Sequence, residues 1–274
     1  MKITVLVDNK AMPGLTTEHG FSLWIESGEK KILFDLGQGK ALWSNAERLG
    51  VDLSQADMLV FSHGHYDHTG GLSRLLSLKP NLDIYCEPRV LALRYSLSKD
   101  KVARDVSIPL DSSGAIATHI GEQIHWVQKP LWLSAEAGMT GEIPRVTSFE
   151  DTGGAFFRDA AGTKPDHIED DQAMWFKTPK GLVIVFGCCH SGMVNSINYI
   201  LQIVGEQRIH AIIGGLHLVN ATKNRLTETC HVLKSLNVDE IIPCHCTGDA
   251  AVDFMRQALG DIVQPGCAGR IYSF

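Results

Sequence analysis

The sequence lacks any apolar run that approaches the length of a membrane-spanning helix. It also lacks a signal-peptide pattern, because the short apolar start at 2–7 is interrupted by Asp8 and no cleavage site follows. We therefore expect no membrane partner, and we read the start of the chain as a first β-strand.

An excess of basic residues is absent too. The chain has 25 Lys and Arg against 31 Asp and Glu, a formal net charge of -6 and a pI near 6.0. The basic residues are scattered, so there is no electrostatic case for binding a nucleic-acid backbone or an anionic membrane. We expect a small-molecule substrate and no nucleic-acid partner, and a homo-oligomer is compatible with these features.

The cysteines do not form the even set that a disulfide framework needs. There are seven, and several lie beside histidines, which favours a reducing compartment and thiols that are buried or near a metal. A cytoplasmic location is the simplest prediction. Low-complexity segments are missing as well, and a composition of 44% hydrophobic and 20% charged residues is typical of a globular protein with a sizeable core.

Strand and helix patterns alternate in both halves of the chain, which predicts an α/β protein with residues 1–274 in one domain. The segment at about 89–150 is irregular, with short strand patterns only at 123–127 and 131–135, and we interpret it as a variable insertion that carries a pocket lid or a dimer contact. The predicted strands are 3–7, 21–26, 31–35, 57–61, 83–87, 173–177, 182–187, 210–215, 240–244 and 270–274. The predicted helices are 40–49, 72–78, 222–236 and 249–259.

The segment HGHYDHTGG at 63–71 carries the strongest chemical signal. His63, His65, Asp67 and His68 follow an apolar strand directly, and the glycines let the backbone turn tightly enough to aim several side chains at one point. Imidazole and carboxylate ligands suit zinc, iron or manganese. His63 and His65 point the same way on an extended segment and can share one ion, while Asp67 and His68 can serve a second.

This pattern resembles the signature of the metallo-β-lactamase superfamily. The resemblance implies an αββα four-layer sandwich with two mixed β-sheets and a site for one or two metals at one edge of the sheets. The further motifs EHGFSLWIE, DDQA, GCCHSG, GGLHL and PCHCTG are similar to the branch named after the dihydropterin and ribofuranosylaminobenzene 5'-phosphate synthase.

The resemblance also implies further site residues. Asp35 matches a carboxylate that orients the metal-binding loop, unless it only forms the turn before Gly37. We prefer His190 as the third ligand of the first metal, with His167 as the alternative because most family members place this histidine earlier. His245 matches the last histidine of the family, which serves the second metal.

Other residues allow more than one role. Cys188 occupies roughly the position where relatives carry a bridging Asp or a Cys ligand, although a buried apolar thiol is the commoner role for such a cysteine. His217 and Asp171 lie at strand edges that face the same rim, where either can contact metal or substrate. Glu18 and His19 lie on a loop that can reach the site or remain on the surface.

Cys244 and Cys246 flank His245, and strand alternation predicts that both point away from it as packed thiols. A structural zinc site made by the cysteines of CCH and CHC, apart from the main site, is an alternative.

The function predicted from these residues is hydrolysis by a metal-bridged hydroxide, which two divalent metal ions activate. Zinc is the expected metal, and manganese or iron are the alternatives. Asp67 would hold this nucleophile, and His217 would contact the substrate or protonate the leaving oxygen. A phosphate ester or phosphodiester of a small molecule is the expected substrate. The alternatives are a synthase or transferase that joins a pterin-like and a ribosyl-phosphate partner, and a non-catalytic metal-binding regulatory protein.

Overall fold

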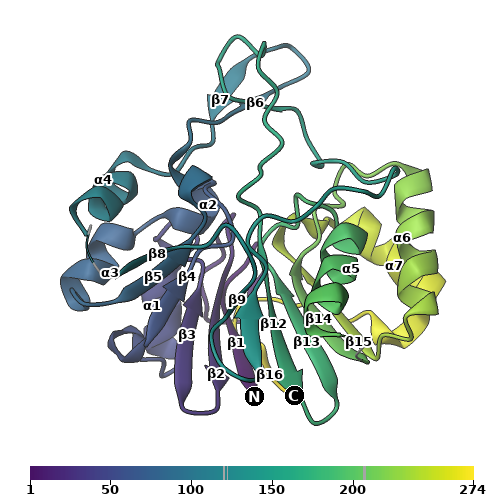
Figure 1. Cartoon of the computed structure of the whole chain (residues 1–274), viewed down its shortest axis with the longest axis horizontal. Helices are drawn as coiled ribbons and strands as arrows, with labels where there is room; N and C mark the ends of the chain where they lie inside the picture. Colours follow the sequence, from purple (N-terminus) through teal and green to yellow (C-terminus); the bar gives the residue numbers. More distant parts are fainter. Residues whose placement is uncertain (120, 122, 206–207) are drawn as a thin grey trace.

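The computed structural model describes residues 1–119, 121, 123–205 and 208–274. Two large mixed sheets lie face to face in it (Figure 1). The first sheet has seven strands in the order β16-β1-β2-β3-β4-β5-β8. Its strands are β1 (Lys2–Val7), β2 (Ser22–Ser27), β3 (Lys30–Phe34), β4 (Met58–Val60), β5 (Asp83–Cys86), β8 (Ile124–Trp126) and β16 (Ile271–Ser273).

The second sheet has six strands in the order β15-β14-β13-β12-β10-β9. These are β9 (Leu131–Trp132), β10 (Ala137–Met139), β12 (Ala173–Thr178), β13 (Gly181–Phe186), β14 (Ile209–Gly215) and β15 (Glu240–Cys244). Strands β3, β4 and β5 run parallel in the first sheet, and β13, β14 and β15 run parallel in the second. These central strands are almost continuously apolar because both faces of each sheet are covered.

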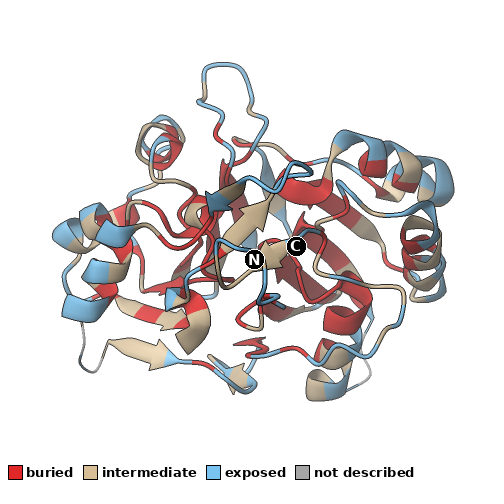
Figure 2. Cartoon of the chain, turned by 90° about the horizontal axis from the view of Figure 1, so that it is seen from above, coloured by how far each residue is buried: buried red, intermediate tan, exposed pale blue. Residues whose placement is uncertain are grey.

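Helices cover the outer face of each sheet, which makes four layers. On the first sheet lie α1 (Ala41–Arg48), α3 (Leu72–Leu78) and α4 (Leu110–Thr118), and on the second lie α5 (Met193–Val204), α6 (Lys223–Ser235) and α7 (Asp249–Leu259). The sheets share a core of facing side chains such as Val60 and Met174. Burial is concentrated on the strands, while the outward faces of the helices are exposed (Figure 2). The predicted αββα architecture with two mixed sheets is confirmed.

The rest of the chain forms short elements. They are the helix α2 (Tyr66–Thr69), the 3-10 turns η1 (Leu53–Gln55), η2 (Pro88–Leu91), η3 (His245–Thr247) and η4 (Gly260–Ile262), and the strands β6 (Tyr95–Leu97), β7 (Ala103–Asp105) and β11 (Phe156–Phe157). The last three make a small sheet that stands above the sandwich in Figure 1.

The segment 89–150 therefore contributes to all three sheets, through β6, β7, β8, β9 and β10. Its variable character and the single-domain organisation stay predictions. None of the helices in the described ranges has the length and apolar character that crossing a membrane requires.

Helix α5 is the main element that the sequence analysis missed. Its cap comes from a distant part of the chain: the Glu150 carboxylate accepts hydrogen bonds from the backbone N–H groups of Val194 (2.9 Å) and Asn195 (2.8 Å). The residue before the helix is Gly192, whose backbone is left-handed (φ 93°) and which has no capping side chain. The local capping signal that marks most helix starts is therefore absent from this stretch.

Candidate metal centre

The carboxyl ends of the parallel strands of both sheets meet at one edge, and most of the predicted site residues lie there. Asp35 follows β3 and His63 follows β4 in the first sheet. Cys188, His217 and His245 follow β13, β14 and β15 in the second sheet. Ligands collect at this edge in open α/β sheets because the connecting loops diverge there.

Three histidines form the first group. Ring nitrogens of His63, His65 and His190 all lie within 4.8 Å of one another, and the distance from His63 Nε2 to His65 Nδ1 is 2.9 Å. His190 Nδ1 donates to the Thr152 carbonyl oxygen (2.8 Å), which turns Nε2 toward the other two rings. Burial lowers the pKa of all three imidazoles well below the usual value, so they are neutral and each has a lone pair to offer.

A buried carboxylate fixes the loop between β4 and α2. Asp35 accepts hydrogen bonds from the Ser62 backbone N–H (2.8 Å) and hydroxyl (2.6 Å), and His68 Nδ1 donates to it at 2.7 Å. His68 Nε2 is left facing Cys188 Sγ at 3.1 Å. Burial lowers the pKa of His68, but the negative charges of Asp35 and Asp67 have the larger effect and raise the pKa to about 9. Asp35 thus has the contacts of a residue that orients a ligand.

The second group surrounds the Asp67 carboxylate. Its Oδ2 lies 3.3 Å from His245 Nε2 and 3.1 Å from His19 Nε2. Burial raises the pKa of Asp67, but the neighbouring histidines, His68 first, outweigh it and hold the pKa well below its ordinary value. His19 therefore reaches the site, and its side chain remains 55% exposed. Its neighbour Glu18 does not, because its carboxylate accepts from backbone N–H groups at the start of α1.

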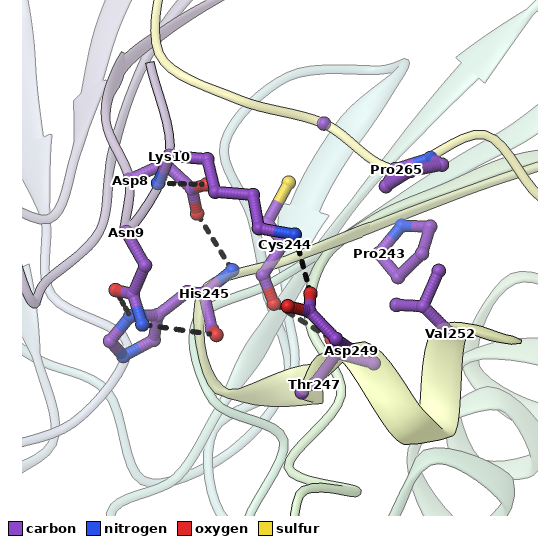
Figure 3. A pocket seen from close by; sticks show the side chains of 12 residues that line it. Asp8, Asn9, Lys10, Pro243, Cys244, His245, Thr247, Asp249, Val252 and Pro265 are labelled. Carbon is purple, nitrogen blue, oxygen red and sulfur yellow. Dashed lines mark hydrogen bonds and ion pairs between the residues drawn. The ribbon is translucent and has the colours of Figure 1, made fainter. Parts of the chain in front are cut away.

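The two residues that follow β1, Asp8 and Asn9, position His245, a role that was not predicted from the sequence. His245 Nδ1 donates to Asn9 Oδ1 (2.8 Å), and its backbone N–H donates to Asp8 Oδ1 (2.7 Å), as Figure 3 shows. Asn9 also accepts from the Gly20 backbone N–H at 3.3 Å. No sequence signal marks Asp8 and Asn9, because they resemble ordinary polar residues at a strand end.

The cysteines around His245 correct one prediction. Cys188 Sγ, Cys246 Sγ and a His245 ring nitrogen lie within 4.8 Å of one another, so Cys246 faces the site. Strand alternation fails here because β15 ends at Cys244 and a 3-10 turn follows, in which His245 has a left-handed backbone (φ 47°). Cys244 is a packed thiol in the inter-sheet core, as expected.

The remaining candidates lie at different distances from the centre. His217 belongs to a group with Cys188 and His190, and its ring centroid is 4.1 Å from that of His190. Asp171 belongs to none of the groups found among the described residues; its Oδ2 accepts from the Ser191 backbone N–H (2.7 Å), and burial raises its pKa to about 6. His167 is exposed and outside these groups as well.

The donor set fits a divalent cation. Three imidazole nitrogens at the centre are buried yet make no well-aligned hydrogen bond with the described residues: His65 Nε2, His190 Nε2 and His245 Nε2. Buried polar atoms are normally paired, so these unpaired nitrogens indicate a missing ligand partner. Imidazole with carboxylate is a donor set for zinc, manganese or iron.

A cavity of about 310 Å³ opens above these groups. The small sheet supplies part of its wall through Ser96, Arg104 and Phe156, and Arg104 Nη2 donates to the Tyr66 hydroxyl at 2.7 Å. Cys188, Cys246 and His217 also line it. A lid was expected in 89–150, but the sequence singled out neither Ser96 nor Arg104 as a wall residue, because this irregular segment has no motif that marks them.

Replacing Asp35 by Asn is expected to weaken metal affinity about 10–100-fold, as the loss of a partner that orients a metal ligand usually does. The amide has only one acceptor oxygen, so it cannot accept from the Ser62 backbone N–H at Oδ1 while it also accepts from the Ser62 hydroxyl and His68 at Oδ2, as the carboxylate does. Affinity is measured by competition with a chelator. Asp57→Asn is the matched control, because Asp57 accepts from the Lys31 backbone N–H at the opposite ends of β3 and β4. Equal affinities of the two variants would contradict the role of Asp35.

Comparison with known proteins agrees with this geometry. Residues 15–188 match the family model described as the metallo-beta-lactamase superfamily. The chain is 29% identical to the 7,8-dihydropterin-6-methyl-4-(beta-D-ribofuranosyl)-aminobenzene-5'-phosphate synthase of Methanocaldococcus jannaschii, over 94% of this chain and 90% of the relative. It is 31% identical to the uncharacterized protein MJ0448 of the same organism, over 93% and 94%.

Among solved structures, Tm1679, described as a metal-dependent hydrolase of the beta-lactamase superfamily, is similar in fold and sequence. It superposes with a TM-score of 0.83 at 27% identity, and the match covers 100% of this chain and 99% of Tm1679.

Proposed function

The chain belongs to the metallo-β-lactamase superfamily, and from that membership we propose that it is a hydrolase with two adjacent divalent metal positions, acting on a phosphate ester or phosphodiester of a small molecule. The observation that carries this proposal is the clustering of buried histidines beside the Asp67 carboxylate under one cavity, where the Nε2 atoms of His65, His190 and His245 have no hydrogen-bond partner among the described residues. We propose zinc as the metal. All seven cysteines are free, which supports a reducing, cytoplasmic location.

The residues divide between the two positions by their contacts. His63, His65 and His190 would hold the first ion, since their ring nitrogens face one another. Asp67, His68 and His245 would hold the second, with Cys188 between the two groups. Divalent cations bound there supply Lewis acidity and lower the pKa of a water toward neutrality.

The side chains around these positions supply binding and proton transfer. Asp67 is a carboxylate at the cavity floor, so it can accept a hydrogen bond from an attacking water and orient it. His217 lines the same cavity, and its Nδ1 makes no hydrogen bond with the described residues, so it is placed to donate a proton to a leaving oxygen. Phe156 contributes an apolar wall next to it, with ring centroids 6.1 Å apart.

Arg104 is the residue that favours a phosphorylated substrate in this proposal. It is an exposed cation in the cavity wall of a chain whose net charge is -6. Its guanidinium donates a hydrogen bond to the Tyr66 hydroxyl, which orients it. Guanidinium groups pair with phosphate oxygens through two parallel hydrogen bonds.

Replacing Arg104 by Ala is expected to raise KM for a phosphorylated substrate about tenfold with little change in kcat, because one charge-assisted hydrogen bond to the substrate is lost. Steady-state kinetics measure both constants. Arg74→Ala is the control, since Arg74 stacks on Trp43 away from the cavity. An Arg104→Ala enzyme with unchanged KM would remove this residue from phosphate binding.

A synthase that joins a dihydropterin and a ribofuranosylaminobenzene phosphate is the second candidate. It is favoured by the 29% identity to the Methanocaldococcus jannaschii enzyme over nearly the whole of both chains. Such a reaction needs two organic substrates and predicts release of pyrophosphate.

A substrate panel separates the two functions. The metal-loaded protein is given a phosphodiester, a phosphomonoester, a thioester and a lactam, and separately a pterin diphosphate with an aromatic ribosyl phosphate. Cleavage of a phosphodiester or phosphomonoester by water alone is the expected result. Pyrophosphate release that requires both organic substrates, with no hydrolysis, would overturn the hydrolase proposal in favour of the synthase.

A further inference from the structure

Two thiols converge on the second metal position from different strands. Cys188 follows β13 and Cys246 lies in the turn after β15, yet both Sγ atoms and a His245 ring nitrogen are within 4.8 Å of one another. Both cysteines are buried, at 3% and 8% exposure, and both line the 310 Å³ cavity. Each sulfur is therefore at the floor of the substrate cavity and not in a hydrophobic core.

The strand between them leaves room for this approach. Strand β14 lies between β13 and β15 in the sheet, and it ends at Gly215. A Cβ at Gly215 would lie 2.6 Å from Cys246 Sγ, so any larger residue would displace the thiol. The left-handed backbone of His245 then turns the chain so that His245 and Cys246 face the same side. The backbone geometry thus directs the second thiol toward the site.

The other cysteines with close neighbours have different surroundings. Cys244 Sγ donates to the Ile242 carbonyl oxygen (3.6 Å) inside the inter-sheet core. Cys189 Sγ lies 3.8 Å from the Ser196 hydroxyl, beneath α5. In contrast, Cys246 Sγ lines the cavity and donates a long hydrogen bond of 3.6 Å to the Cys188 carbonyl oxygen, a bond that does not use the sulfur lone pairs.

We propose that Cys246 joins Cys188 and His245 at the second metal position as an additional sulfur ligand and gives this position a preference for zinc over manganese. Thiolates select zinc, whereas carboxylate and water ligands suit manganese and magnesium. This inference rests on the proposed metal site, but it does not depend on the reaction that the site catalyses.

Cobalt(II) substitution tests the ligands directly. Cobalt bound to thiolate shows a sulfur-to-metal charge-transfer band in the near ultraviolet, separate from the visible bands that any cobalt site shows. The cobalt-loaded wild-type protein is expected to show this band. The Cys246→Ser variant is expected to lose about half of the band, because one of two sulfur ligands is gone, and the double variant Cys188→Ser/Cys246→Ser is expected to lose all of it. Cys244→Ser and Cys189→Ser, whose thiols lie in the cores, should keep the full band.

The outcomes separate this inference from the proposed function. Visible cobalt bands without a charge-transfer band, or a full charge-transfer band in Cys246→Ser, would overturn sulfur ligation by Cys246 and leave the histidine site standing. Failure to bind cobalt at all would overturn both. In a competition with equal zinc and manganese, the zinc-to-manganese ratio bound by Cys246→Ala should fall about tenfold, and an unchanged ratio would contradict the proposal.

Discussion

Replacing Asp67 by Ala is expected to lower kcat/KM about 10³-fold or more and to remove the second metal ion, while the fold survives. The loss of a Lewis acid costs several kcal/mol of transition-state stabilisation, and each ~1.4 kcal/mol is a factor of ten in rate. The fold should survive because, within the described part of the chain, the Asp67 carboxylate pairs with the site residues His19 and His245 alone. Its backbone carbonyl, which the substitution keeps, accepts from the Phe21 N–H at 3.2 Å.

The measurement pairs steady-state kinetics with metal analysis and a thermal melt. Asp83→Ala is the matched control, since Asp83 is a carboxylate at the start of β5 that pairs with His125 (2.9 Å) outside the cavity. Wild-type turnover in an Asp67→Ala protein that holds a single metal ion would refute the two-metal proposal.

Replacing Arg94 by Met is expected to lower the free energy of unfolding by about 3–5 kcal/mol, the usual cost of removing one partner from a buried ion pair. Arg94 is fully buried and donates from Nε to Asp166 Oδ2 (2.9 Å) and from Nη1 to Asp170 Oδ2 (2.9 Å). Methionine would leave two buried carboxylates without their shared cation. Urea denaturation measures the loss.

The same change is expected to weaken metal binding. Asp170 Oδ2 also accepts from the backbone N–H of Gly64, at 2.8 Å, and Gly64 lies between His63 and His65. Arg158→Met is the control, because Arg158 also donates to Asp166 (2.9 Å) but is 30% exposed, and its loss should cost about 0–1 kcal/mol. Equal losses in the free energy of unfolding for the two variants would contradict the expectation that the buried ion pairs of Arg94 stabilise the fold more than the partly exposed pair of Arg158.

The parts of this protein that could be predicted from sequence are those with a strong local signal. Apolar strands such as 182–187, and helices that end near a glycine, such as 40–49, lie within a residue or two of the predicted bounds. The cluster from His63 to His68 could be identified because four potential metal ligands lie within six residues directly after one strand. Asp35 was assignable by resemblance, and its contacts with Ser62 and His68 are those of an orienting residue.

The parts that escaped prediction depend on contacts between distant segments. Asn9 orients His245 across the sheet edge, and Glu150 caps α5 from another loop, so neither leaves a local pattern. Cys246 was placed on the wrong side because alternation was continued beyond the end of β15, where the chain turns. Arg104 lies in the cavity wall because β7 pairs with β6 above the sandwich, and this pairing leaves no local pattern in the sequence.

Metal content per chain is the most direct test of the central claim that these histidines and Asp67 form a metal centre. The protein is purified without chelator, and its metals are quantified by mass spectrometry beside His190→Ala and the control His231→Ala, whose histidine lies on α6 outside the cavity. Two divalent ions per chain are expected in the wild type and in His231→Ala, and one in His190→Ala. A wild-type protein without metal, or a His190→Ala protein that keeps the full content, would contradict it.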